Sequence, residues 1–395
     1  MKRLLLTLLL PLLGIASANA APTLNVKPQN SIFPVGDIEG FTLSGKNSIY
    51  FVNKVDRTSD VIVTALDSSN QVLWTRTIDA GGDEVATAAT VDAIGNIWLA
   101  GAMAPVIQIE TSTVPVVIDN PDQVNVDDPS QLRADMTTLT LWKLAPTGEL
   151  LATQTSEMSS VPLISAVSVN SSGASVVGIL NNKPFALSAN NAGVFGKIVT
   201  LGSEKTAFND VQRGSDGSLN IYGSSSETLL KKKLAGKRDG ILMTINKAGV
   251  ITQLVRSSAP QALREWQSAS QINVTTGSVV TGKVIETAIT QFTKTYSPTW
   301  TLRIPSTGQS RITSINGVTY LALTSKSAIT GITGWKPLAP SLLIIAFDSK
   351  GVMKGAYSFP GLITPIALTS TRDGGVVGAG RAADSTVSIF RLTSR

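Results

Sequence analysis

The stretch ATVDAIGNIWLAG (residues 89–101) contains an apolar strand, a turn with Asp and Gly, and a second apolar strand that ends in a small residue. Gly supplies a positive φ at tight turns, and Asp side chains hydrogen-bond across them. The pattern recurs about every 55 residues, a period that indicates a repeat architecture. The other copies are AVSVNSSGASVVG (166–178), DVQRGSDGSLNIYG (210–223), QINVTTGSVVTG (271–282) and LTSTRDGGVVGAG (368–380).

A second kind of hairpin lies between these copies, at residues 61–78, 138–155, 240–257 and 341–359. Two hairpins per repeat make a four-stranded antiparallel sheet, the blade of a β-propeller. The spacing predicts an all-β propeller, most simply of seven such blades. Only one strand, within residues 385–395, follows the last first-type hairpin. We expect residues 29–37 to supply the missing outer strand of that blade and so to close the ring.

At the level of residues, LDSSNQVLWTRTI (66–78) followed by DEVATAATVDAIGNIWLAG (83–101) resembles the bacterial seven-bladed β-propeller repeat family. The first-type hairpin is also similar to that of NHL repeats. The resemblance implies a propeller fold and no single activity.

The first twenty residues have the layout of a secretory signal peptide. Lys2 and Arg3 precede an apolar run at residues 4–15, and Ala18-Asn19-Ala20 provides a cleavage site. The alternative, a membrane anchor, needs about 20 apolar residues, more than this run offers. We therefore expect residues 1–20 to be removed and 21–395 to form one propeller domain without a transmembrane segment. The mature protein is expected outside the cell, secreted or held at its surface.

Composition limits the chemistry. The chain has no His and no Cys, which excludes Ser/His/Asp and Cys/His nucleophiles and imidazole metal sites. A hydrolase that uses two carboxylates stays possible, and its candidate residues are Asp83, Glu84, Glu204, Asp239 and Glu265. The formal net charge of +6 is too small and too dispersed to indicate nucleic-acid binding.

Long connections fall at residues 53–60, 103–137, 224–239 and 325–339, and each joins the second strand of a blade to the third. By strand alternation they leave the ring on one side, here called the elaborated face, where we expect function because binding residues concentrate on loops of rigid scaffolds. One loop contains a basic cluster, with two interpretations: a solvated loop, or a binding site for an anionic polymer. Its residues are Lys231, Lys232, Lys233, Lys237 and Arg238.

Two further features are expected on this face. Trp266 and Trp335 could present exposed indoles to a sugar or a protein partner, or could cover the end of the core. The acidic insertion at 103–137 could bind Ca²⁺ through Asp119, Asp122, Asp127 and Asp128, or could be a polar surface loop. No other cofactor is expected.

Two function classes follow. The favoured one is a monomeric, non-catalytic propeller that binds a protein or polysaccharide through the elaborated face. The alternative is a carboxylate-dependent, carbohydrate-active hydrolase with its site at the central channel.

Overall fold

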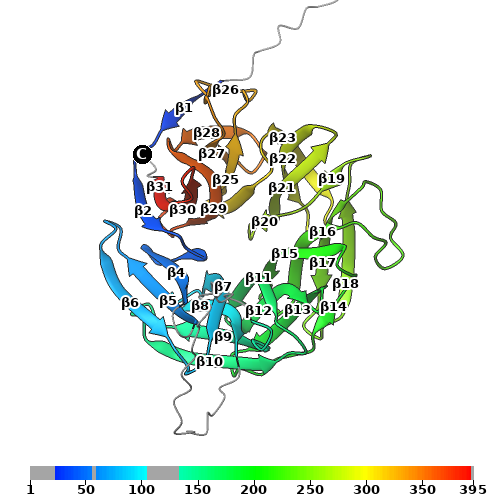
Figure 1. Ribbon diagram of the computed structural model, residues 1–395. Helices are drawn as coiled ribbons and strands as arrows, with labels where there is room; N and C mark the ends of the chain where they lie inside the picture. Colours follow the sequence, from blue (N-terminus) through cyan, green and yellow to red (C-terminus); the bar gives the residue numbers. More distant parts are fainter. Residues whose placement is uncertain (1–22, 56–58, 105–132, 393–395) are drawn as a thin grey trace, which may run out of the picture.

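The computed structural model describes residues 23–55, 59–104 and 133–392, which form a ring of β-sheets (Figure 1). The all-β propeller prediction is confirmed at this level. Within the described ranges the regular elements are strands, and no helix there is both long enough and apolar enough to cross a membrane.

Four sheets each contain four consecutive antiparallel strands. The first holds β3 (Gly40–Ser44), β4 (Asn47–Val55), β5 (Ser59–Leu66) and β6 (Val72–Ile78). The second holds β7 (Glu84–Val91), β8 (Ile97–Met103), β9 (Thr138–Leu144) and β10 (Leu150–Glu157). The third holds β11 (Leu163–Asn170), β12 (Gly173–Leu180), β13 (Lys183–Asn190) and β14 (Val199–Thr200). The fourth holds β15 (Thr206–Arg213), β16 (Leu219–Ser225), β17 (Asp239–Ile245) and β18 (Ile251–Ser257).

Three sheets are irregular. The fifth has its inner strand split into β19 (Leu263–Arg264) and β20 (Ser268–Ala269), beside β21 (Val274–Thr281), β22 (Val284–Phe292) and β23 (Pro298–Pro305). The sixth holds β24 (Ser310–Ile315), β25 (Val318–Ser325), β27 (Ser341–Phe347) and β28 (Met353–Ser358), with β1 (Leu24–Pro28) and β26 (Ile332–Thr333) added. The last combines β29 (Leu362–Ser370), β30 (Val376–Ala382) and β31 (Val387–Leu392) with β2 (Ile32–Gly36).

The prediction of seven uniform blades with four antiparallel strands each is wrong as stated. Six sheets are built around one continuous stretch of chain, and two of these exceed four strands. The N-terminal segment also does more than supply one closing strand. While β2 pairs antiparallel with β31, β1 pairs parallel with both β28 and β26 and so extends the sixth sheet.

The small residue that ends three of the first-type hairpins, at Gly101, Gly178 and Gly223, has a steric cause. The inner strands β7, β11 and β15 each contain a register shift, which pushes a backbone carbonyl against the neighbouring strand. A Cβ at Gly101, Gly178 or Gly223 would lie 1.9–2.0 Å from that carbonyl oxygen, so only Gly fits. In the fifth sheet the equivalent residue is Gly277. The sequence alignment on Gly282 is therefore wrong: residues 271–282 hold a turn and one strand, because β21 begins at Val274.

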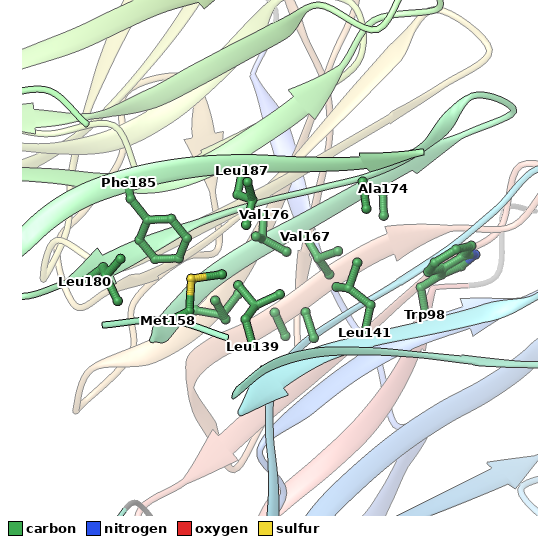
Figure 2. Close-up of a cluster of buried hydrophobic side chains, with 14 residues drawn as sticks. Trp98, Leu139, Leu141, Met158, Val167, Ala174, Val176, Leu180, Phe185 and Leu187 are labelled. Atoms are coloured by element: carbon green, nitrogen blue, oxygen red, sulfur yellow. The ribbon is translucent and has the colours of Figure 1, made fainter. Parts of the chain in front are cut away.

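The core lies between adjacent sheets. Figure 2 shows one such cluster, in which Trp98, Leu139 and Leu141 of the second sheet face Val176 and Phe185 of the third. Similar clusters lie between other neighbouring sheets, so the burial of apolar side chains between blades stabilises the ring. This scaffold positions the connecting loops.

Candidate functional site

Three of the four predicted long connections are present, and they join β8 to β9, β16 to β17 and β25 to β27. The long connection predicted at residues 53–60 is wrong, because β4 extends to Val55 and β5 begins at Ser59. Each links the second and third strands of a sheet, so they emerge on the same face of the ring. The loop between β16 and β17, residues 226–238, lies wholly within the described chain; we call it the blade-four loop.

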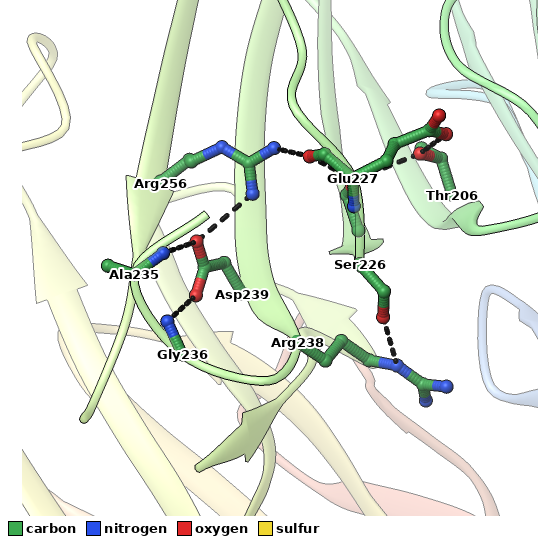
Figure 3. Close-up of polar contacts among 9 residues, drawn as sticks. Thr206, Ser226, Glu227, Ala235, Gly236, Arg238, Asp239 and Arg256 are labelled. Carbon is green, nitrogen blue, oxygen red and sulfur yellow. Dashed lines mark hydrogen bonds and ion pairs between the residues drawn. The ribbon is translucent and has the colours of Figure 1, made fainter. Parts of the chain in front are cut away.

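A buried ion pair anchors the blade-four loop (Figure 3). Arg256 of β18 lies 3.0 Å from Asp239, and the two side chains are 7% and 0% exposed. The Asp239 carboxylate also accepts hydrogen bonds from the backbone N–H groups of Ala235 and Gly236, at 3.1 and 2.9 Å. Burial alone would raise the pKa of Asp239, but hydrogen bonds from Ser258, these two amides and Arg256 lower it overall. The loop is thus closed onto a charged, buried carboxylate.

Both ends of the loop are tied to the chain segments that lead into and out of the fourth sheet. The Glu227 carboxylate accepts hydrogen bonds, both at 2.7 Å, from the N–H of Ser203 in the connection that precedes β15 and from the hydroxyl of Thr206, the first residue of β15. Arg256 donates to the Glu227 carbonyl oxygen. At the other end, Lys237 N–H donates to the Ala262 carbonyl at 2.8 Å, in the connection to the fifth sheet. The backbone is therefore held before any partner arrives.

The tip of the loop is a two-residue turn in an unusual conformation. The Lys232 N–H donates to the Leu229 carbonyl at 2.8 Å, and Leu230 and Lys231 have φ of 46° and 64°. Positive φ at both central positions defines a type I′ turn, which favours Asn and Gly and costs other residues about 1 kcal/mol each. Leu229 is buried, whereas Leu230 is 54% exposed. A strained turn therefore presents an apolar side chain to solvent.

The exposed Leu230 is surrounded by uncompensated positive charge. Lys231, Lys232, Lys233 and Lys237 are exposed, and no acidic group within the described ranges forms an ion pair with any of them. Arg238 differs from these lysines, because its guanidinium lies 3.7 Å from the Glu265 carboxylate and donates to Ser226. A shallow concavity of about 310 Å³ adjoins the turn, lined by Leu230, Lys232 and residues 251–255.

Of the two interpretations of Trp266 and Trp335, the structure agrees with the one in which the indoles are buried in the core. Trp266 is 0% exposed and Trp335 is 5% exposed. Trp266 packs edge-on against Phe292, with ring centroids 5.6 Å apart, and the Arg264 guanidinium lies 4.4 Å from its ring. Trp266 follows the carbonyl that faces Gly277, as Phe208 follows the carbonyl that faces Gly223 in the fourth sheet, and both side chains are buried. Neither indole is available to stack on a ligand.

The five candidate carboxylates do not gather into one site. Asp239 pairs with Arg256, Glu265 lies near Arg238, and Glu204 is exposed. Asp83 pairs with Arg133 and accepts a hydrogen bond from the Ser59 N–H at 2.5 Å.

Glu84 alone of these candidates approaches other carboxylates, those of Asp60 and Asp79. The candidate calcium ligands Asp119, Asp122, Asp127 and Asp128 lie outside the described residues.

Sequence reasoning missed Leu230 and Arg256 in the basic region and Asp60 and Asp79 beside Glu84. The run LLKKK at residues 229–233 could have indicated an apolar residue within the basic cluster. Arg256 carried no local signal, because its partner lies on another strand.

No protein-family model matches the chain, and no curated protein matches it. Solved structures are similar in fold. The chain matches the β-propeller domain of the Trilobed protease from Pyrococcus furiosus with 10% identity and a TM-score of 0.52, over 92% of this chain and 96% of that one. It matches the RRP9 WD40 repeats with 9% identity and a TM-score of 0.54, over 94% and 99%. It matches the WD40 domain of Toxoplasma gondii coronin with 10% identity and a TM-score of 0.51, over 94% and 89%. These similarities place the chain among the β-propellers and establish the fold alone.

Proposed function

We propose that this chain is an exported, non-catalytic β-propeller that binds an acidic protein partner through the blade-four loop. The observation that carries the proposal is the tip of that loop. An exposed Leu230 lies in a strained turn among four lysines without described acidic partners, on a backbone that is hydrogen-bonded at both ends to the connections before and after the fourth sheet. Export rests on the signal-peptide layout of residues 1–20, and the repeat-level resemblance to bacterial propellers agrees with it.

A protein is a better match for this surface than a polysaccharide. Protein interfaces combine an apolar anchor with charged groups at the rim, which corresponds to Leu230 among the lysines. Sugar rings are usually bound on exposed aromatic faces, and both candidate indoles are buried. Because the loop is already anchored, little conformational entropy is lost when a partner binds.

The alternative, a carboxylate-dependent hydrolase, has less support. Its acid and base must both contact the substrate, yet Glu84 is fully buried and lies between the first two sheets. The remaining candidate carboxylates are dispersed over the ring.

A charge-reversal experiment tests the proposal. We would change Lys231, Lys232 and Lys233 to Glu, and measure binding of a fluorescent poly-glutamate peptide by anisotropy at low salt. The matched control reverses Lys247, Lys294 and Lys350, which are exposed in turns on the opposite face, so the net charge changes equally. We expect at least tenfold weaker binding for the loop variant only, and weaker binding of the parent as salt rises. Equal weakening in both variants would show that net charge, rather than the loop, attracts the peptide.

A second measurement separates a protein partner from a generic anion site. A photoreactive residue placed at position 230 should crosslink a discrete protein from the culture medium, and the lysine reversals should abolish the crosslink. The same probe at Leu151, an exposed residue of β10, is the control. Identical products at both positions would contradict the proposal.

A further inference from the structure

Three carboxylates meet where the first sheet contacts the second. Asp60 lies near the start of β5, Asp79 follows β6, and Glu84 is the first residue of β7. One carboxylate oxygen from each lies within 4.8 Å of the other two. Asp60 and Asp79 lie beside each other at the end of the β5–β6 hairpin, because Val61 pairs with Ile78, and Glu84 follows Asp79 after a short connection to the second sheet.

Glu84 has an unsatisfied oxygen in this cluster. The residue is 0% exposed. Its Oε1 accepts a hydrogen bond from the Ala80 N–H at 3.1 Å, but Oε2 is buried with no hydrogen-bond partner among the described residues. A buried carboxylate oxygen without a partner is strongly unfavourable unless a proton or a cation compensates it.

The guanidinium of the neighbouring Arg133 does not compensate this oxygen. Arg133 pairs with Asp83 and Asp135, and no Lys or Arg of the described chain forms an ion pair with Glu84 or Asp79. Burial, together with the charges of Asp79 and Asp60, raises the pKa of Glu84 to about 7. Oε2 of Glu84 therefore requires a proton or a cation that no described side chain supplies.

We propose that Asp60, Asp79 and Glu84 bind a divalent cation of the calcium type. Ca²⁺ takes six to eight oxygen ligands in flexible geometry. Three carboxylates supply between three and six oxygens, and water completes the shell. Since Asp60 belongs to the first sheet and Glu84 to the second, the cation clamps the two blades together on the elaborated face.

Thermal unfolding of the mature chain tests this proposal. In 2 mM CaCl₂ the parent should melt about 3 °C or more above its Tm in EDTA, because a cation that binds only the folded state stabilises it. Glu84→Gln and Asp79→Asn should each abolish the calcium shift. Their Tm in EDTA should equal or exceed that of the parent, because each removes one repelling charge, so a lost shift would not reflect misfolding.

Two controls make the result decisive. Glu204→Gln removes an exposed carboxylate of the same face and should keep the full shift. A variant with Asp119, Asp122, Asp127 and Asp128 changed to Asn should keep it too. No shift in the parent, a shift that persists in Glu84→Gln, or a shift lost in the four-Asp variant would each overturn the proposal. The first outcome would indicate that a proton satisfies Glu84, and the second that calcium binds elsewhere.

Discussion

The carboxylate cluster between the first two sheets and the blade-four loop belong to the same face of the ring. They differ in whether the uncompensated charge is buried or exposed. In the cluster, two further carboxylates lie close to the fully buried Glu84, so negative charge is concentrated there. In the loop, the buried charges Asp239 and Arg256 compensate each other, and the uncompensated lysines are solvent-exposed. A buried excess charge indicates a small ion, whereas an exposed excess charge indicates a macromolecular surface.

The ion pair beneath the loop should give the largest effect on stability. Arg256→Met leaves the Asp239 carboxylate buried and charged, which typically costs about 3–5 kcal/mol. The matched control is Arg303→Met, whose partner Glu286 lies 3.5 Å away in a more exposed pair and should contribute less than about 1 kcal/mol. Urea unfolding of both variants at pH 7 measures the difference. Similar losses would mean that burial does not distinguish the two pairs.

The change of stability with pH should have opposite signs for Glu84 in the cluster and Asp239 beneath the loop. The pKa of Glu84 is raised to about 7, so the folded state holds its proton more tightly than the unfolded state. Its contribution to stability is therefore greatest below about pH 4.5 and is lost as the pH rises to 7, by at most about 3 kcal/mol. The pKa of Asp239 is lowered, so its contribution is present above the ordinary Asp pKa and is lost as the pH falls through the folded value.

Urea unfolding in EDTA at pH 5 and pH 7.5 checks the sign for Glu84. The parent should lose stability at the higher pH, and Glu84→Gln should lose clearly less. A smaller decrease should remain in the variant, because the pKa of Asp210 is also raised, to about 6. An unchanged pH dependence in Glu84→Gln would show that Glu84 does not titrate in this range.

The regular part of this architecture was readable from the sequence because its causes are local. Turn residues and apolar strands follow each other along the chain, and the Gly that faces a bulged carbonyl is required within a single hairpin, as at Gly101. The alternation of strand direction, which is also local, predicts that the long loops lie on one face. The solvent exposure of the lysines in the blade-four loop was also predicted correctly.

What the sequence could not reveal depends on contacts between distant segments. Asp60 and Asp79 are neighbours within the β5–β6 hairpin, but Glu84 joins them where β7 of the second sheet packs against β5 of the first. Parallel pairing of β1 with β28 joins residues more than three hundred positions apart. The sequence left open whether Trp266 is exposed or covers the core, because its burial depends on contacts such as that with Phe292 of another strand.

The smallest effect, and the one that bears most directly on function, concerns the strained turn. Leu230→Asn with Lys231→Gly gives the turn the residues that type I′ geometry favours, and should stabilise the protein by about 1–2 kcal/mol in urea unfolding. Leu230 is mostly exposed, so little packing is lost. The same variant should bind the partner crosslinked at position 230 more weakly, because it lacks the apolar anchor and one lysine. Asn190, which begins a turn on the opposite face, provides a control site: Asn190→Ala should reduce stability slightly and leave binding unchanged. If the turn variant were more stable and bound equally well, the strain at Leu230 would have no functional role, and the lysines alone would define the site.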